Sequence, residues 1–206
     1  MSDLSNQLKN EKSPYLKQHE SNPVHWAPWN KKSLLKAKQE KKPIFLSIGY
    51  ASCHWCHVMA HESFEDKNTA KIMNENFINI KVDREERPDI DFIFQKSLGI
   101  LTGAQGGWPL SMFLDENAVP FTGGTYFPPK ELQGRPSFKN VLENVSKVYS
   151  ENREKIIKQV EQMRMVFDEL NSKNAVLKQD LEPLAEKILQ YMDITNGGLQ
   201  GSPKFP

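Results

Sequence analysis

The chain has 206 residues, of which 38% are hydrophobic and 26% are charged, and its formal net charge is +1. This length allows one well-packed core with additions, or one domain and part of another. The near-neutral charge argues against nucleic acid or an anionic membrane as a partner, and no apolar run approaches the roughly 20 residues that span a bilayer. Residues 1–15 are polar and lack the apolar segment of a secretory signal. With its 2 cysteines, the chain fits a reducing compartment, so we expect a cytoplasmic protein.

The first part of the chain leads up to the cysteines. We interpret residues 13–29 as an N-terminal strap packed on the core, because its prolines limit regular structure while Trp26 and Trp29 need apolar cover. The elements expected next are a helix over 30–42, a buried strand over 43–48, a helix from Cys53 with Ser52 as N-cap that breaks near 63–66, and a helix over 67–76 capped by Asp66.

The second part continues the alternation of strands and helices. The elements expected there are a half-buried strand over 77–83, a charged turn over 84–88, a helix over 90–101, strands over 110–114 and 121–127, helices over 138–149 and 152–170, a polar linker over 171–179 and a helix over 181–192. The order β–α–β–α–β–β–α predicts an α/β fold of the thioredoxin-like kind, a mixed sheet flanked by helices on both faces.

Both cysteines lie in one motif, Cys53-His54-Trp55-Cys56, where an apolar strand gives way to a helix. A helix N-terminus carries unpaired N–H groups and a partial positive charge, which stabilise a thiolate on the first cysteine. The i, i+3 spacing keeps the second sulfur close enough for a disulfide. We therefore expect Cys53, facing solvent, to attack a substrate and Cys56 to resolve the mixed disulfide.

The residues around the cysteines are expected to tune the pair. An imidazolium at His54 or His57 lowers a thiol pKa, which makes the cysteine a better leaving group. Trp55 is expected to form an apolar lid on the disulfide. Trp108-Pro109 precedes an apolar strand, and in thioredoxin-like folds a cis-proline at this point lies against the disulfide, where the preceding backbone binds an extended substrate segment.

Two other readings of the motif stay open at this point. Cys53-His54-Trp55-Cys56-His57 also matches C-x-x-C-H, the attachment motif of c-type haem, although a strand-led α/β pattern is unlike a small helical cytochrome. The other reading is a zinc site built from Cys53, Cys56, His57 and His61. Against zinc, Cys56 and His57 are adjacent and point about 100° apart on a helix.

The carboxylates carry less information. The acidic residues of segment 83–91 are interleaved with Arg84 and Arg87, so we interpret this cluster as a solvated charged turn. Glu62 and Glu65 lie beyond the cysteines on the same helical stretch, where either could serve as a proton acceptor for Cys56.

Several separate motifs together resemble one known family, the spermatogenesis-associated thioredoxin-like proteins, which occur from bacteria to animals as a domain of unknown function. The resemblance covers about residues 12–170. The motifs that carry it are Ser13-Pro14-Tyr15-Leu16, Asn22-Pro23-Val24, Trp26, Pro28-Trp29, the cysteine motif with His57-Val58-Met59, Glu62-Ser63-Phe64, Val82 to Asp89, and Gly106-Gly107-Trp108-Pro109.

The resemblance also implies a domain division. It implies a thioredoxin-like domain with its strap over 1–135, a C-terminal helical extension over 136–170, and a segment over 171–206 that is a linker and the start of a helical, α/α-toroid-like domain in a longer parent chain. Two departures from thioredoxin itself affect the mechanism. Ser47 stands where thioredoxins carry a buried Asp, and the Lys that partners this Asp corresponds to Asn79, so their proton relay is not expected here.

Taken together, the sequence predicts a thiol–disulfide oxidoreductase that needs no cofactor. Cys53, Cys56 and Pro109 are the expected catalytic residues, while His54, Trp55 and Trp108 are expected to bind substrate. The expected partners are a protein or small-molecule disulfide and a thiol electron donor. The alternative is a non-catalytic binding module that docks a partner domain, since a shared fold does not transfer an activity.

Overall fold

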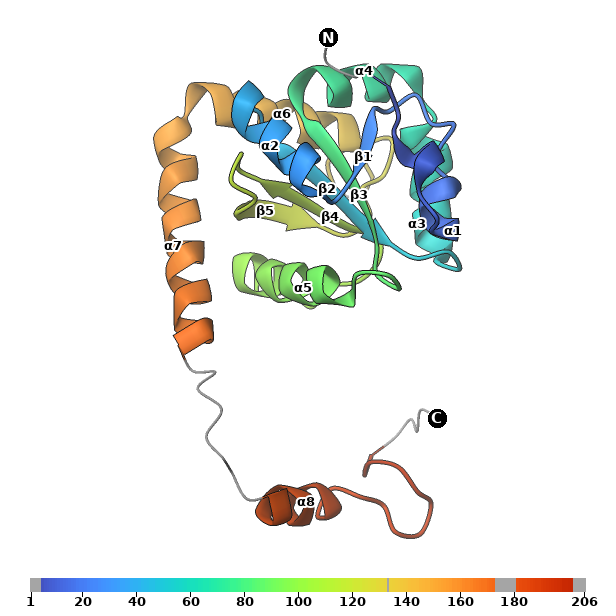
Figure 1. Ribbon diagram of the computed structural model, residues 1–206, viewed down its shortest axis with the longest axis vertical. Helices are drawn as coiled ribbons and strands as arrows, with labels where there is room; N and C mark the ends of the chain where they lie inside the picture. Colours follow the sequence, from blue (N-terminus) through green and yellow to red (C-terminus); the bar gives the residue numbers. More distant parts are fainter. Residues whose placement is uncertain (1–4, 133, 173–180, 202–206) are drawn as a thin grey trace. The chain divides into compact units, whose positions relative to one another are not determined.

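The computed structural model describes residues 5–132, 134–172 and 181–201 (Figure 1). The chain divides into two compact units, Met1–Phe167 and Asp168–Pro206, and each is described by itself. The polar linker expected over 171–179 lies, from residue 173 onward, outside the described residues.

The first unit is built around a five-stranded mixed sheet with the strand order β1-β3-β2-β4-β5. Strands β1 and β2 both run parallel to β3, whereas β4 is antiparallel to β2 and β5 is antiparallel to β4. The strands span Trp26–Pro28 (β1), Ile44–Gly49 (β2), Ile78–Asp83 (β3), Leu110–Leu114 (β4) and Pro120–Gly124 (β5). The predicted thioredoxin-like α/β architecture is confirmed.

Helices cover both faces of this sheet (Figure 1). One face packs against α1, α3, α4 and α6 around Phe45 and Phe113, and the other packs against α2 and α5 around Ile44, Leu46 and Ile48. The helices are α1 (Pro14–Lys17), α2 (Lys31–Glu40), α3 (His54–Met59), α4 (Lys67–Asn76), α5 (Pro88–Thr102), α6 (Phe138–Glu151), α7 (Arg153–Ser172) and α8 (Leu181–Leu189), with a 3-10 turn η1 (Leu8–Asn10) and a π-helix η2 (Ala60–Phe64).

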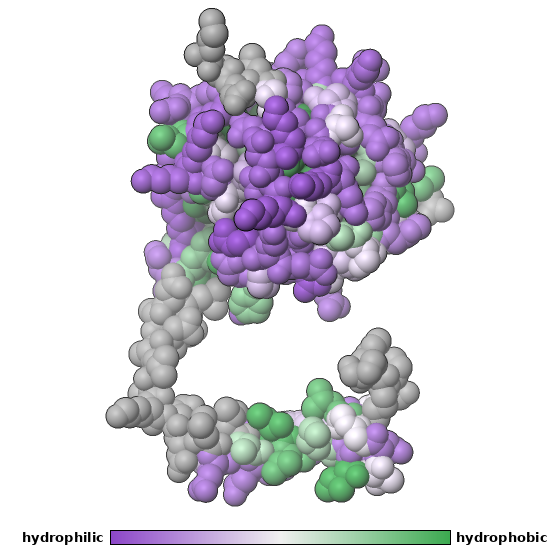
Figure 2. Space-filling model, turned by 45° about the vertical axis from the view of Figure 1, so that its right-hand side comes forward, coloured by the Kyte–Doolittle hydropathy of each residue, from purple (hydrophilic) through white to green (hydrophobic). Residues whose placement is uncertain are grey.

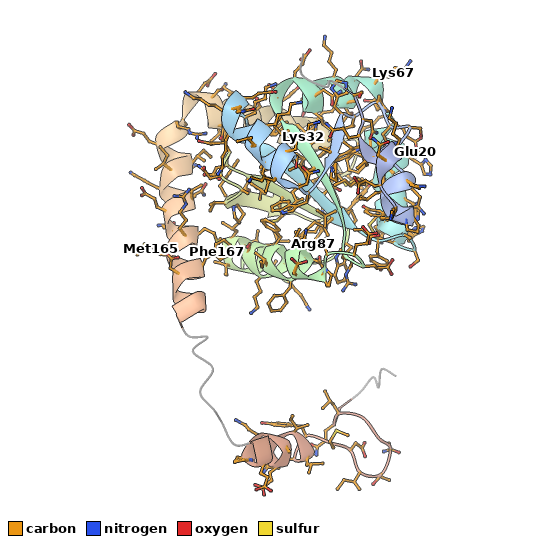
Figure 3. The ribbon with its side chains drawn as sticks, viewed as in Figure 1. Glu20, Lys32, Lys67, Arg87, Met165 and Phe167 are labelled. Carbon is orange, nitrogen blue, oxygen red and sulfur yellow. A yellow bond between two sulfur atoms is a disulfide. The ribbon has the colours of Figure 1, made fainter. Side chains whose placement is uncertain are left out.

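Strand β3 is buried along its whole length, so the prediction of a half-buried strand is wrong. Its alternation of apolar and polar residues is typical of a strand with one wet face. Because β3 lies between β1 and β2 with helices on both sides, its polar residues lie inside the protein instead. Lys81 and Asp83 are only 1% and 3% exposed. Other charged residues of the unit, such as Glu20, Lys32 and Lys67, lie at the surface (Figure 3).

The N-terminal strap contains more regular structure than the sequence predicted. Residues Trp26–Pro28 form the edge strand β1, and Ser13 caps the short helix α1 by accepting a hydrogen bond from the backbone N–H of Leu16. Tyr15 and Trp26, which belong to this strap, are buried against the core, with exposed fractions of 1% and 0%. The expected packing of the strap on the core is confirmed.

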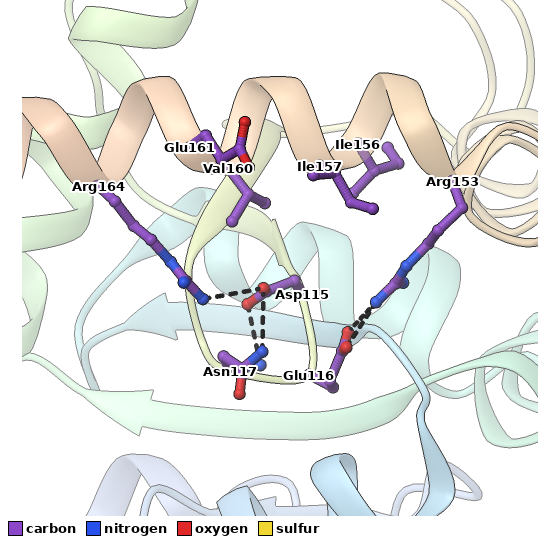
Figure 4. Close-up of a pocket in the computed structure, with 9 residues that line it drawn as sticks. All are labelled: Asp115, Glu116, Asn117, Arg153, Ile156, Ile157, Val160, Glu161 and Arg164. Atoms are coloured by element: carbon purple, nitrogen blue, oxygen red, sulfur yellow. Dashed lines mark hydrogen bonds and ion pairs between the residues drawn. The ribbon is translucent and has the colours of Figure 1, made fainter.

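Helix α7 is attached to the turn between β4 and β5 by charged pairs (Figure 4). Arg153 donates hydrogen bonds to Glu116, which also accepts one from Tyr149, and Arg164 lies 3.8 Å from Asp115. These pairs line a hollow whose apolar wall comes from α7. Although burial opposes ionisation, the bonds from Tyr149 and Arg153 lower the pKa of Glu116, so the carboxylate stays charged. These charged groups of the hollow are thus already paired with one another.

The second unit contains α8 and a turn that closes where Met192 and Leu199 form a β-bridge. It exposes large apolar side chains, which appear green in Figure 2, among them Leu189 at 64% and Ile194 at 96%. No helix in the described part of the chain is both long and apolar enough to cross a membrane.

His19 makes the stability of the first unit sensitive to acid. The ring is 2% exposed and bonds to Asn22 Oδ1 at 2.9 Å, and burial lowers its pKa from 6.5 to about 2. The unfolded chain therefore binds a proton that the folded chain does not between these two pKa values. We expect the stability that neutral His19 provides at pH 7 to be lost as the pH falls below 6.5, by up to about 1.4 kcal/mol per pH unit.

The variant His19→Phe tests this, because it keeps a ring and removes the titration. Urea unfolding at neutral and acidic pH should give a shallower pH dependence in the variant than in the wild type. Equal slopes would show that His19 does not control the acid response.

Candidate functional site

The two cysteines form a disulfide at the start of α3. The sulfurs are 2.07 Å apart and the Cα atoms 5.2 Å apart. Cys53 is the N-cap residue of the helix, and Cys56 lies one turn further on. The predicted pairing of the two sulfurs at a strand-to-helix junction is confirmed.

Cys53 itself caps the helix, so the prediction that Ser52 does so is wrong. The backbone N–H of Cys56 donates a hydrogen bond to Cys53 Sγ at 3.2 Å, whereas the Ser52 side chain is exposed. A sulfur in this position already accepts the hydrogen bond that would stabilise a thiolate. The atom that caps the helix is therefore Cys53 Sγ itself.

Cys53 does not face solvent, which corrects a second expectation. It is 3% exposed and Cys56 is 2% exposed. Both belong to the larger hydrophobic cluster, against which Tyr50, Trp108 and Tyr126 pack. The first sulfur is buried because it lies within this cluster, although its position at the helix start would by itself leave it accessible.

Trp55 projects outward and is 53% exposed. Its ring lies 5.1 Å from that of Tyr126 and 5.6 Å from that of His54. Tyr126 in turn donates a hydrogen bond to Glu62 at 2.6 Å, and its pKa is raised to about 12 by burial and by that carboxylate. His54, Trp55 and Tyr126 therefore form a group of neighbouring rings at the cysteine motif, with Trp55 half exposed. We call this group, together with Trp108, the aromatic rim.

The Trp108-Pro109 peptide bond is cis, as predicted from its position. The Trp108 indole is fixed by Asp91, whose Oδ1 accepts a hydrogen bond from Nε1 at 2.9 Å. Arg84 bonds the other oxygen of Asp91 at 3.0 Å and stacks 4.1 Å from the Trp108 ring. Asp91 is 4% exposed, so this part of the charged segment is structural, and its interpretation as a solvated turn is wrong there.

The histidines and glutamates that follow the motif have other partners. His57 Nε2 lies 2.8 Å from the backbone oxygen of Ala51, and His61 pairs with Glu65 at 2.9 Å. The geometry therefore gives no support to a zinc site shared by these imidazoles and the cysteines, whose sulfurs are bonded to each other. Since Glu65 bonds His61 on the exposed side of the helix, it is poorly placed to take a proton from the buried Cys56.

A polar floor lies on the inner side of the disulfide. We use this name for Tyr15, Ser47 and Lys81. Lys81 Nζ donates a hydrogen bond to Ser47 Oγ at 3.1 Å, and the two residues are register partners of β2 and β3. The lysine opposite Ser47 is therefore Lys81, and the assignment of that position to Asn79 is wrong, because Asn79 pairs with Phe45. The register could not be read from the sequence, so the floor was missed.

Gly49 lets the floor approach the disulfide. A Cβ at this position would lie 2.7 Å from Cys56 Sγ and would overlap the Tyr15 hydroxyl. Both atoms are buried, and the sulfur is held by its disulfide, so neither has space to withdraw. We expect Gly49→Ala to destabilise the oxidised protein by about 1–3 kcal/mol, as overpacked cores do.

Gly99→Ala is the matched control. An added Cβ there lies 3.7 Å from its nearest neighbour, an ordinary contact, and the residue is inside helix α5, where alanine is favoured over glycine. Denaturant midpoints of the two variants should therefore move in opposite directions. A Gly49→Ala protein as stable as the wild type would show that the contact between β2 and the disulfide is loose.

Comparisons with known proteins agree with this geometry. Residues 5–168 match the family described as "Protein of unknown function, DUF255". An uncharacterized protein of Caenorhabditis elegans is 42% identical over 209 residues, and the match covers 100% of this chain and 28% of that protein. Spermatogenesis-associated protein 20 of rat is 39% identical, with 98% of this chain and 26% of that protein covered. The chain thus spans little more than a quarter of the length of these relatives.

Solved structures with low sequence identity were also found. One is described as a DsbH oxidoreductase, with 20% identity, a TM-score of 0.42, and coverage of 62% of this chain and 83% of that one. Another is a thioredoxin from Thermus thermophilus, with 17% identity, a TM-score of 0.43, and coverage of 64% and 95%. Because the family model matches most of the chain, and relatives align with nearly all of it, the chain belongs to the DUF255 family, the thioredoxin-like group related to spermatogenesis-associated protein 20.

Proposed function

We propose that this protein is a thiol–disulfide oxidoreductase in which Cys53 is the nucleophile and Cys56 the resolving cysteine. The observation that carries the proposal is the disulfide at the start of α3, with Cys53 Sγ accepting the N–H of Cys56. A hydrogen bond to sulfur at a helix start favours the thiolate, which is the form that exchanges disulfides. No cofactor is needed for this chemistry.

Written in the reducing direction, the exchange has two steps. The Cys53 thiolate attacks a substrate disulfide, a bond forms between Cys53 and one substrate sulfur, and the other substrate sulfur leaves with the electron pair and takes a proton from water. Cys56 then loses its proton and attacks Cys53 Sγ, which releases the second substrate thiol. The substrate gains two electrons, and a thiol donor returns the protein to its reduced state.

We further propose that substrate binds over the aromatic rim beside the disulfide. Trp55 and His54 are exposed, and Trp108, which precedes the cis Pro109, has its indole fixed by Asp91 and Arg84. A rim of this kind fits a peptide or a small disulfide with apolar groups. The rim residues must move aside for an attack on Cys53, because the sulfur is covered in the oxidised form.

A second candidate function, a non-catalytic binding module, is favoured by one observation. Both cysteines are at most 3% exposed, as structural disulfides are. In that case the fold would dock a partner or a further domain of a longer chain. The relatives leave room for such a domain, since this chain covers only 26–28% of their length, and we propose that the parent chain continues into a helical domain. A cytoplasmic location likewise stays a prediction.

Substitution of the cysteines tests the oxidoreductase. We expect Cys53→Ser to abolish insulin reduction with dithiothreitol as donor, because the attacking sulfur is gone. Cys56→Ser should instead accumulate a mixed disulfide with the substrate, detectable by its mass, because the first step remains and the second does not.

Ser52→Ala is the control, since it changes an exposed residue next to the motif and keeps both sulfurs. Its rate should equal that of the wild type. An unchanged rate in Cys53→Ser, or a wild-type disulfide that glutathione does not open and reform reversibly, would favour the binding module.

A further inference from the structure

The most unusual group in the first unit is a buried lysine below the disulfide. Lys81 is 1% exposed, and its Nζ lies 4.6 Å from the centres of the Trp26 and Phe64 rings and 5.1 Å from that of Tyr15. Within the described part of the chain, this nitrogen forms a hydrogen bond with Ser47 Oγ. A buried ammonium is costly without a carboxylate partner.

Burial shifts the lysine toward its neutral form. It lowers the pKa of Lys81 well below its usual value, and among the described residues no carboxylate forms an ion pair with the amine to offset this. Asp83 lies two residues further along β3, but its carboxylate accepts hydrogen bonds from Ser13 Oγ at 2.6 Å and from the backbone N–H of Glu85 at 2.9 Å. A neutral amine has a free lone pair, so it can accept a proton.

The Tyr15 hydroxyl lies between the lysine side of the floor and the disulfide. Its oxygen faces Ser47 but, within the described residues, lacks a hydrogen bond of good geometry. Burial raises the pKa of this phenol, so the hydroxyl stays protonated. A Cβ atom added at Gly49 would contact both this oxygen and Cys56 Sγ, so the two groups lie near each other. A buried, unsatisfied hydroxyl therefore lies on the inner side of the resolving cysteine, and buried polar groups of this kind are rare.

We propose that Lys81 is the proton acceptor for Cys56 in the second exchange step, with the hydroxyls of Tyr15 and Ser47 as relays. The proposal rests on the oxidoreductase function proposed above. The Cys56 proton moves to Tyr15, whose own proton moves to Ser47, whose proton moves to Lys81 Nζ. The Cys56 sulfur then forms its bond with Cys53 Sγ, and the substrate sulfur leaves with the electron pair. One proton ends on the amine, which loses it to solvent after the product has left.

Other titratable groups face the same region from neighbouring elements. His19, at the end of α1, interacts electrostatically with Lys81, His57 and His61, and its lowered pKa keeps it uncharged at neutral pH. Asp83 interacts with Tyr15. Of these groups, Lys81 is the one with both a hydrogen bond into the floor and a lone pair made available by burial.

The two exchange steps can be followed separately with Ellman's reagent. Reduced protein releases one thionitrobenzoate when Cys53 attacks the reagent and a second when Cys56 resolves the mixed disulfide. In Lys81→Met we expect the second release to slow by about tenfold or more near neutral pH, as general-base losses do. The rate should recover toward the wild type near pH 9, where hydroxide deprotonates the thiol directly. The first release should change by less than about twofold.

Matched variants separate this role from a structural one. Lys71→Met makes the same substitution at an exposed lysine of α4 and should leave both releases unchanged. Tyr15→Phe keeps the ring and should slow only the second release. Lys81→Met should also unfold at no lower urea concentration than the wild type at pH 7, because an apolar chain suits this site better than a lysine.

Each outcome has one meaning. If the wild type gives two releases and Lys81→Met gives the same pH profile, the relay is wrong and the oxidoreductase stands. If Asp83→Asn, and not Lys81→Met, shifts the profile, Asp83 is the acceptor and the proposal is overturned. If the wild type gives no first release, the oxidoreductase itself fails. A slowing that is equal at every pH assigns Lys81 a purely structural role and also overturns the relay.

Discussion

The functional site depends on the in-register parallel pairing of β2 with β3. This pairing sets Ser47 opposite Lys81 and Gly49 opposite Asp83, directly before the loop that carries the cysteines. A slip of one residue would turn every one of these side chains to the other face of the sheet. The hydrophobic residues that alternate with them, from Ile44 to Val82, pack on α2 and α5 and hold the register. Apolar packing on one face of the sheet thus sets the positions of Ser47 and Lys81 on the other face.

That polar chemistry opposes stability. Burying Lys81 among the rings of Trp26 and Phe64 costs free energy, because the amine loses its hydration there and is driven toward its neutral form. The strap contributes two of the surrounding groups, Tyr15 and Trp26. The aromatic rings of the strap thus cover the buried amine of Lys81. Proteins commonly keep such unfavourable groups at functional sites.

The sequence predicted the elements that depend on local signals and missed those that depend on register and burial. The strand before the cysteines, the Asp66 cap and the cis bond before Pro109 follow from short motifs. By contrast, polar residues in β3 indicated a wet face, because alternation cannot distinguish a solvated face from a buried polar floor. The assignment to Asn79 failed for the same reason, since strand pairing is a tertiary property.

The coverage of Cys53 was also invisible in the sequence. The cluster that buries the two cysteines draws its residues from many separate segments, and Tyr50, Trp108 and Tyr126 pack against it from three of them. From its position at the helix start, Cys53 Sγ was expected to be hydrogen-bonded and exposed to solvent. The hydrogen bond from Cys56 N–H is confirmed, whereas the expected exposure is wrong. Local chemistry and tertiary packing therefore have to be read separately at this site.

The two sulfurs consequently have different surroundings, and this asymmetry supports the roles proposed for them. Cys53 Sγ accepts a backbone N–H, which stabilises negative charge on that sulfur. Cys56 Sγ receives no such bond from its own helix and borders the Tyr15 hydroxyl through the space left by Gly49. The first sulfur thus has a backbone donor that favours negative charge, and the second borders a buried hydroxyl. This difference fits the proposed order, in which Cys53 attacks first and Cys56 resolves.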